Sequence, residues 1–271
     1  MTAVGIVTGA GSGIGAACAR RLAGTVDVLF LADIDEAPLA VLAGEITTGE
    51  PIALDGTDAA ALQRLAERAS ATGTLRRVVH AAGISPTMGD WRRILEVDLV
   101  GSALLVEALR PLATTGTAFV CFASMAAHLS MQSPQSLNLE ADSAVDQPLA
   151  DDFFDTYCAA VGDQARDPGV AYAWAKRGVQ RLVSRESTVL GPRGARICSI
   201  SPGMIDTPMG RQEYEQQPMM KVLDDITPLR RMGRPDELAA VAAFLVSDDA
   251  SFMTGVDVLV DGGVCAAVAA M

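Results

Sequence analysis

Short, wholly apolar segments alternate with longer amphipathic segments along most of the 271-residue chain. The short segments lack the apolar–polar alternation of a half-exposed strand, and such continuous apolar runs are typical of parallel strands covered on both faces. The longer segments carry apolar residues at helical spacing. Repeated strand–helix units predict a single α/β domain, with one doubly wound parallel sheet between two helical layers (α/β/α).

The expected strands and helices follow this alternation. The strands are expected at Val4–Val7, Val26–Ala32, Pro51–Leu54, Val78–Ala81, Ala118–Ala123, Arg196–Ile200 and Val256–Val260. The helices are expected at Gly13–Leu22, Pro38–Ile46, Ala59–Ala71, Trp91–Leu109, Tyr172–Leu190 and Asp236–Val246. Between Ala127 and Val170 the pattern is lost. Because structureless loops of that length are uncommon, we interpret residues from about 128 to 169 as an insertion with one or two helices, one of them over Asp151–Val161.

Composition argues against several classes of partner. The formal net charge of −12 repels phosphate backbones and anionic lipid, so neither nucleic acid nor a membrane surface is expected. No apolar run approaches the roughly 20 residues that span a bilayer, and no basic stretch precedes an apolar one at the N-terminus. Five cysteines without a CxxC spacing and two histidines argue against a metal site. Free thiols suit a reducing compartment, so a cytoplasmic location is expected.

The first expected strand runs directly into the glycine-rich sequence Thr8-Gly9-Ala10-Gly11-Ser12-Gly13-Ile14-Gly15. Glycines there permit a tight turn and let a pyrophosphate approach the backbone, while the N–H groups and dipole of the following helix favour its charge. A strand, this loop and a helix in that order predict a Rossmann-type dinucleotide site. Its residues would be Gly9, Gly11, Ser12, Gly13, Ile14 and Gly15.

Asp33 stands at the end of the second expected strand. A carboxylate there can accept hydrogen bonds from the adenosine ribose and would repel a 2′-phosphate. Ile34 follows it and Ser12 lies in the loop, so no cation stands in either place, and NAD is favoured over NADP. Asp55 follows the third strand and allows two interpretations: an acceptor for the adenine amino group, or a cap for the helix that follows Asp58.

Tyr172 and Lys176 are four residues apart on an expected helix and therefore share a face. A lysine ammonium close to a phenol lowers the pKa of the tyrosine, which makes it a usable acid–base nearer neutral pH. The pair predicts proton transfer by Tyr172.

The chain resembles the short-chain dehydrogenase/reductase family over nearly its whole length. Beside the glycine loop and the Tyr-x-x-x-Lys pair, three further motifs match in the family's order. They are Ser124 within Phe122–Ala126, the Pro-Gly turn and Thr-Pro within Ser201–Met209, and the C-terminal pattern from Gly233-Arg234-Pro235 to Asp261-Gly262-Gly263. The resemblance implies hydride transfer between NAD(H) and a secondary alcohol or ketone, in a homo-oligomer (dimer or tetramer).

The resemblance also implies a role for each matched residue. Tyr172 would be the general acid–base, Ser124 would orient and polarise the substrate oxygen, and Lys176 would bind the nicotinamide ribose and tune Tyr172. Further cofactor contacts are implied for Ala82, Gly83, Pro202, Gly203, Ile205 and Thr207. Residues from about 208 to 228 would cover the substrate. The apolar side chains there suggest a lipophilic or alicyclic substrate, with a steroid as one candidate: Met209, Tyr214, Met219, Met220, Val222 and Leu223.

Three features depart from the family pattern. The usual Asn-Ala-Ala-Gly reads His80-Ala81-Ala82-Gly83, and His80 is interpreted as structural. A second family Asn, which helps to hold a water in the proton relay, falls on Asp98. Aspartate has a similar shape but brings a charge and loses two donors, so a catalytic role for Asp98 depends on its backbone carbonyl. The insertion lengthens the gap from Ser124 to Tyr172, and would serve as lid, interface or decoration.

Two alternatives stay open. An NADP-linked reductase of the 3-oxoacyl type is disfavoured by Asp33. A catalytically silent NAD-binding member is favoured by Asp98 and disfavoured by Ser124, Tyr172 and Lys176.

Overall fold

The computed structural model describes residues 1–130 and 138–271, and its centre is a seven-stranded sheet in the order β3-β2-β1-β4-β5-β6-β7. All neighbouring strands are parallel, as predicted. The chain starts in the middle, builds outward to β3, and then crosses back to β4. The carboxyl ends of β1 and β4 therefore flank the point where the strand order reverses, which is where open α/β sheets bind their ligands. The strands are β1 (Ala3–Thr8), β2 (Val28–Asp33), β3 (Gly49–Ala53), β4 (Thr74–His80), β5 (Ala118–Phe122), β6 (Arg196–Pro202) and β7 (Asp257–Val260).

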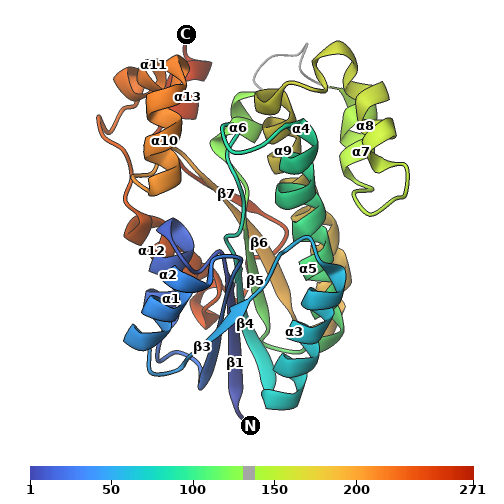
Figure 1. Cartoon of the computed structure of the whole chain (residues 1–271), viewed down its shortest axis with the longest axis vertical. Coiled ribbons are helices and arrows are strands. Elements are labelled where there is room, and N and C mark those ends of the chain that lie inside the picture. Colours follow the sequence, from blue (N-terminus) through green and yellow to red (C-terminus); the bar gives the residue numbers. More distant parts are fainter. Residues whose placement is uncertain (131–137) are drawn as a thin grey trace.

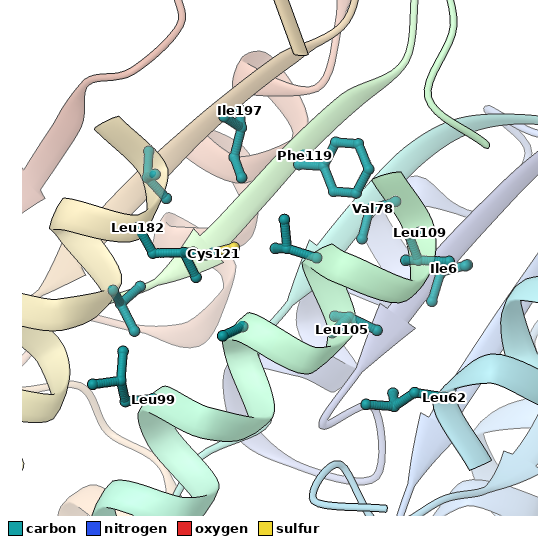
Figure 2. Packing of buried hydrophobic residues seen from close by; sticks show 14 of the residues in the cluster. Ile6, Leu62, Val78, Leu99, Leu105, Leu109, Phe119, Cys121, Leu182 and Ile197 are labelled. Carbon is teal, nitrogen blue, oxygen red and sulfur yellow. The ribbon is translucent and has the colours of Figure 1, made fainter. Parts of the chain in front are cut away.

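Helices cover both faces of the sheet, which confirms the three-layer prediction (Figure 1). One face carries α1 (Gly13–Leu22), α2 (Glu36–Glu45) and α12 (Pro235–Leu245). The other carries α3 (Ala59–Thr72), α4 (Trp91–Leu95), α5 (Gly101–Leu109) and α9 (Pro168–Leu190). Figure 2 shows the core on this second face, where Phe119 and Ile197 of the sheet lie near Leu105 and Leu182 of the helices.

The single helix expected over Trp91–Leu109 is interrupted. A π-helical turn, Glu96–Val100, separates α4 from α5, and the N–H of Gly101 donates to the carbonyl of Glu96, five residues back. The apolar spacing continues through this turn, so nothing in the pattern marked it. Asp98 lies inside the turn and is fully buried.

The segment between β5 and α9 contains three α-helices in its described part: α6 (Met125–Leu129), α7 (Leu139–Val145) and α8 (Phe153–Val161). Residues 131–137 of the predicted insertion lie outside the described residues. The helix expected near Asp151–Val161 is present as α8. Its Phe153 and Tyr157 are buried, and Tyr157 stacks on Trp91 of α4 with ring centroids 6.2 Å apart.

Helix α7 is fixed to α9 by ion pairs. Asp142 pairs with Arg177 at 3.1 Å and with Arg181 at 3.0 Å, and Asp146 pairs with Arg181 and with Arg185. Helix α7 therefore packs on α9 of its own chain, while α8 packs on α7 and, through Tyr157, on Trp91 of α4.

The chain beyond β6 forms helices that the apolar pattern did not predict: α10 (Pro208–Gln216), α11 (Pro218–Ile226) and, at the C-terminus, α13 (Val264–Ala269). Met125, Met204, Met220, Leu223 and Val264 form a small apolar cluster that joins α11 and α13 to the carboxyl end of the sheet. Among the described residues, every helix is too short or too polar to cross a bilayer.

Several boundaries differ from the expected ones. Helix α9 begins at Pro168 rather than at Tyr172, because Asp167 caps it by accepting from the N–H of Val170 at 2.9 Å. Strand β2 begins at Val28 rather than at Val26.

Candidate active site

The glycine loop after β1 has a backbone that side chains would prevent. Gly9 has a φ of +66°, and a Cβ there would lie 2.6 Å from the backbone nitrogen of Ala82. A Cβ on Gly15 would collide with the carbonyl of Gly9, so loop and helix can approach this closely only with glycine. Ser12 precedes α1, and its side chain makes no capping hydrogen bond. The first-turn N–H groups are thus available to a pyrophosphate, and the loop fits a dinucleotide.

A cleft of about 320 Å³ opens at this loop, where the strand order reverses. It extends from the glycine loop past the ends of β2, β3 and β4. Most of the residues predicted to bind the cofactor line it: Gly9, Ser12, Gly13, Ile14, Gly15, Asp33, Asp55, Ala82, Gly83 and Thr207. Gly11 lies outside the lining and contributes through its backbone.

Asp33 is fixed at the end of β2, at the edge of the cleft. Its Oδ2 accepts from the N–H of Gly11 at 2.8 Å, and its Oδ1 accepts from the N–H of Asp35 at 3.1 Å. A carboxylate held by two backbone donors keeps its orientation before any ligand binds, and both oxygens retain lone pairs for further donors.

Asp55 does not cap helix α3, so that interpretation is wrong. Asp58 accepts from the N–H groups of Ala60 and Ala61, whereas Asp55 accepts from the backbone and hydroxyl of Thr57 at 2.9 and 2.7 Å. These hydrogen bonds from Thr57 lower the pKa of Asp55. The Arg93 guanidinium, 3.8 Å from Asp55, also lines the cleft. Sequence reasoning missed this cation, because α4 brings it in from a distant part of the chain.

A second pocket, of about 270 Å³, adjoins the cleft, and Ile14, Gly83 and Thr207 line both. It brings together the three residues of the predicted proton-transfer site, Ser124, Tyr172 and Lys176. Predicted contacts of the nicotinamide end line it too: Pro202, Gly203, Ile205 and Thr207. Sequence reasoning missed Glu213 and Gln217 of the α10 region and Leu129 of α6, which also line it.

Ser124 and Tyr172 meet from different elements. Ser124 lies two residues after β5 and caps α6, and its Oγ accepts from the N–H of Ala126 at 3.2 Å. Tyr172 lies in the second turn of α9 and hydrogen-bonds the Ser124 hydroxyl. The Lys176 ammonium lies 5.5 Å from the centroid of the Tyr172 ring, so the pair shares a face as expected.

Lys176 is paired with the buried Asp98. Its Nζ lies 3.0 Å from Asp98 Oδ1 and 3.3 Å from the carbonyl of Phe122. The same Oδ1 accepts from the N–H of Ile84 at 3.1 Å, while Oδ2 has no partner among the described residues. Burial raises the pKa of Asp98, and Lys176 opposes that rise. Asp98 lines neither pocket, and it acts on the site through Lys176.

The expectation that Lys176 lowers the pKa of Tyr172 is wrong for this structure. Burial raises the pKa of Tyr172, the negative charges of Asp98 and Glu213 raise it further, and only the hydrogen bond with Ser124 opposes them. The main physical reason is burial, which disfavours the charged phenolate. The ion pair adds to it, because Asp98 offsets the ammonium charge that would otherwise favour the phenolate.

His80 is held within the protein at both ring nitrogens. The Ser102 hydroxyl donates to the carbonyl of Asp98 at 2.7 Å, so its oxygen accepts from His80 Nε2 at 2.9 Å. His80 Nδ1 is then the acceptor for the hydroxyl of Thr8, at 2.7 Å. Burial lowers the pKa of His80 to about 3, and Lys176 adds to this effect. The ring is neutral and fully bonded, which fits the structural interpretation.

Comparison with known proteins identifies the family. A sequence profile described as "Enoyl-(Acyl carrier protein) reductase" matches residues 9–140 and 156–265. D-threitol dehydrogenase of Mycolicibacterium smegmatis is 32% identical, over 96% of this chain and 92% of its own. Cyclohexanol dehydrogenase of an Acinetobacter species is 31% identical, over 96% and 93%. The chain belongs to the short-chain dehydrogenase/reductase family.

A solved structure supports the same assignment. A short-chain dehydrogenase/reductase from Mycobacterium ulcerans superimposes with a TM-score of 0.75 at 26% identity, covering 97% of this chain and 90% of that one. This family comprises nicotinamide-dependent oxidoreductases. Residues 141–155, which the family profile leaves unmatched, lie in the segment between β5 and α9.

Proposed function

We propose that this short-chain dehydrogenase/reductase transfers hydride between NAD(H) and a secondary alcohol or ketone. The observation that carries the proposal is the convergence of Ser124, Tyr172 and Lys176 in one pocket that opens into the dinucleotide cleft. A screen of secondary alcohols, with NAD and NADP side by side and reduction followed at 340 nm, tests it. Absence of turnover with every alcohol and ketone would favour the catalytically silent alternative.

The bound nicotinamide would supply the hydride acceptor, and the chain supplies orientation and proton transfer. In the oxidative direction the Tyr172 phenolate takes the hydroxyl proton, while the Ser124 hydroxyl donates to the substrate oxygen and fixes its position. Lys176 would hold the nicotinamide ribose when the cofactor is bound. Because the Asp98 carboxylate pairs with its ammonium group, Lys176 keeps its position when no cofactor is bound.

The preference for NAD is proposed from the fixed carboxylate of Asp33. A ribose 2′-hydroxyl can donate to it, whereas a 2′-phosphate would meet a negative charge that cannot turn away. The same feature disfavours the NADP-linked 3-oxoacyl reductase alternative.

We expect Asp33→Ala to lower the ratio of kcat/KM for NAD to kcat/KM for NADP by about 10- to 100-fold. The variant loses one charge-assisted hydrogen bond to the ribose of NAD and no longer repels the 2′-phosphate of NADP. Steady-state kinetics with each cofactor measure it. Asp35→Ala is the matched control, because Asp35 is two residues away and caps α2 outside the cleft. Comparable kcat/KM for both cofactors in the unmutated protein would contradict the proposal.

The substrate is proposed to be a small alicyclic or otherwise lipophilic alcohol. Residues 208–228 cover the pocket in this proposal, and apolar side chains of α10 and α11 line it: Met209, Met219, Met220 and Leu223. The volume of about 270 Å³ is at the small end for ligand sites, which favours a single-ring alcohol over a steroid. The names of the relatives, which include cyclohexanol and threitol dehydrogenases, are consistent with small alcohols.

The segment 128–169 is proposed to be an insertion that stiffens its own subunit. Helices α7 and α8 line neither pocket, and among the described residues of the segment, those that line a pocket are Leu129 and Gly169, near its two ends. We further propose a cytoplasmic homo-oligomer, a dimer or a tetramer. No disulfide joins any of the five cysteines, and the edge strand β7 ends the sheet with the exposed Leu259.

We expect Asp98→Asn to move the acidic limb of the pH profile for alcohol oxidation to lower pH, by about one unit or more. The Asp98 charge raises the pKa of Tyr172, and the oxidative step needs the phenolate, so removing that charge makes the base available at lower pH. Measuring kcat/KM against pH in both proteins checks this. Asp142→Asn, at another buried and paired aspartate, should leave the limb in place. An unmoved limb in Asp98→Asn would rule out this coupling.

A further inference from the structure

One carboxylate stands in the wall of the second pocket among apolar side chains. Glu213 of α10 lines the pocket together with Ser124 and Tyr172, while Met209 and Met220 lie in the same wall. Within the described residues, no group donates a hydrogen bond to its carboxylate. A partly buried carboxyl group without a protein partner is unusual, because burial costs free energy unless a donor compensates for it.

Two hydrogen bonds fix the position of α10, the helix that carries Glu213. Thr207 caps α10 by accepting from the N–H of Gly210 at 2.9 Å. Gln212, the residue before Glu213, donates to the hydroxyl of Thr87 at 3.1 Å and so connects α10 to the loop that follows β4. Glu213 is therefore part of a helix that is anchored at its first turn and to the loop after β4, and it lines the pocket.

Glu213 shares its pocket with Tyr172 and Lys176, and its charge is coupled to both. Burial raises the pKa of Glu213 to about 7, Lys176 opposes the rise and Asp98 adds to it. Glu213 in turn raises the pKa of Tyr172. A carboxyl group with a pKa near neutrality exists in both forms, and a hydroxyl can bond either form because it both donates and accepts. An ammonium group, by contrast, would need the ionised form.

We propose that Glu213 binds a second hydroxyl group of the substrate, so that the preferred substrate is an alicyclic diol rather than a mono-alcohol. This inference rests on the proposed alcohol dehydrogenase function and narrows its substrate class. Ser124 and Tyr172 hold the reacting oxygen, and Glu213 holds the other one, which fixes which carbinol carbon faces the nicotinamide. Glu213 is thus a specificity-determining residue.

The test compares cyclohexanol with cyclohexane-1,2-diol and cyclohexane-1,4-diol, which differ only by the second hydroxyl. In the unmutated protein we expect one of the diols to have a kcat/KM above that of cyclohexanol by about 10- to 100-fold, the range for a hydrogen bond to a charged group. Glu213→Leu should remove most of this preference through a higher KM for the diol. Glu213→Gln, which keeps the shape and an acceptor oxygen, should remove part of it and serves if the Leu variant fails to fold.

The matched control is Glu215→Leu, in the same helix but on its exposed surface, which should leave the diol-to-cyclohexanol ratio unchanged. Equal kcat/KM for cyclohexanol and for both diols in the unmutated protein would overturn the inference. So would a diol-to-cyclohexanol ratio of kcat/KM that is unchanged in both Glu213 variants. Either result would leave the proposed alcohol dehydrogenase function intact. Failure to oxidise any alcohol, with either cofactor, would overturn the proposed function instead.

Discussion

Tyr172→Phe should lower kcat by roughly 10²–10⁴ while NAD binding is retained, the usual range for the loss of a general acid–base. The change keeps the ring beside Lys176 and removes the oxygen that Ser124 bonds. Steady-state rates with the best alcohol from the screen, together with NAD titration by fluorescence, measure the two effects separately.

Tyr157→Phe is the matched control for Tyr172→Phe. The Tyr157 hydroxyl is buried in α8 without a hydrogen-bond partner among the described residues, and it lines neither pocket. Removing it should leave turnover unchanged, since no bond is lost. Near-normal turnover in Tyr172→Phe would show that another group moves the proton, and equal losses in both variants would point to a general structural defect.

Phe153→Ala should lower the free energy of unfolding by about 3–5 kcal/mol, the cost of removing a buried phenyl ring and leaving a cavity. Phe153 is 2% exposed, lies 5.0 Å from Phe154 between ring centroids, and belongs to the core cluster on the α9 side of the sheet. Urea unfolding followed by circular dichroism, at one protein concentration for all variants, measures the loss.

Phe252→Ala provides the comparison for this core substitution, because the same atoms are removed from a fully exposed side chain. A change within about 0.5 kcal/mol is expected there. If Phe153→Ala costs no more than Phe252→Ala, the segment between β5 and α9 packs loosely and the proposal that it stiffens its own subunit is wrong.

The inner strands of the sheet could be predicted because they are covered on both faces. Strands such as β1 and β5 have almost every side chain buried, so the continuous apolar run is the direct trace of their environment. Helix α8 could be predicted from its apolar stripe for the same reason. Helices α10 and α11 were missed for different reasons: α10 buries none of its residues, and α11 is amphipathic but only nine residues long. Both begin with proline, and Thr207 before Pro208 is a recognisable start signal.

The candidate site was predicted in its members but not in its charges. The glycine loop and the Tyr172–Lys176 spacing are local patterns, so they can be recognised directly along the sequence. The pKa of Tyr172 rises instead because the folded chain buries it, and because Asp98 and Glu213 add negative charge from other elements. Pairings such as Arg93 with Asp55 and Lys176 with Asp98 arise only when the chain is folded, and no spacing along it indicates them.

The π turn at Glu96–Val100 sets how two side chains of one continuous helical segment are rotated relative to each other about its axis. Each residue of an α-helix advances about 100° around the axis, so one residue more or fewer turns everything on one side of it by that angle. Upstream of the turn, Trp91 must face Tyr157, and within it Asp98 must face Lys176. Deleting one residue here would restore a regular helix and rotate Trp91 relative to Asp98. Either the contact of Trp91 with Tyr157 or the ion pair of Asp98 with Lys176 would then be lost. Insertions and deletions should therefore be far rarer at 96–100 over evolutionary time than in the surface helix α2.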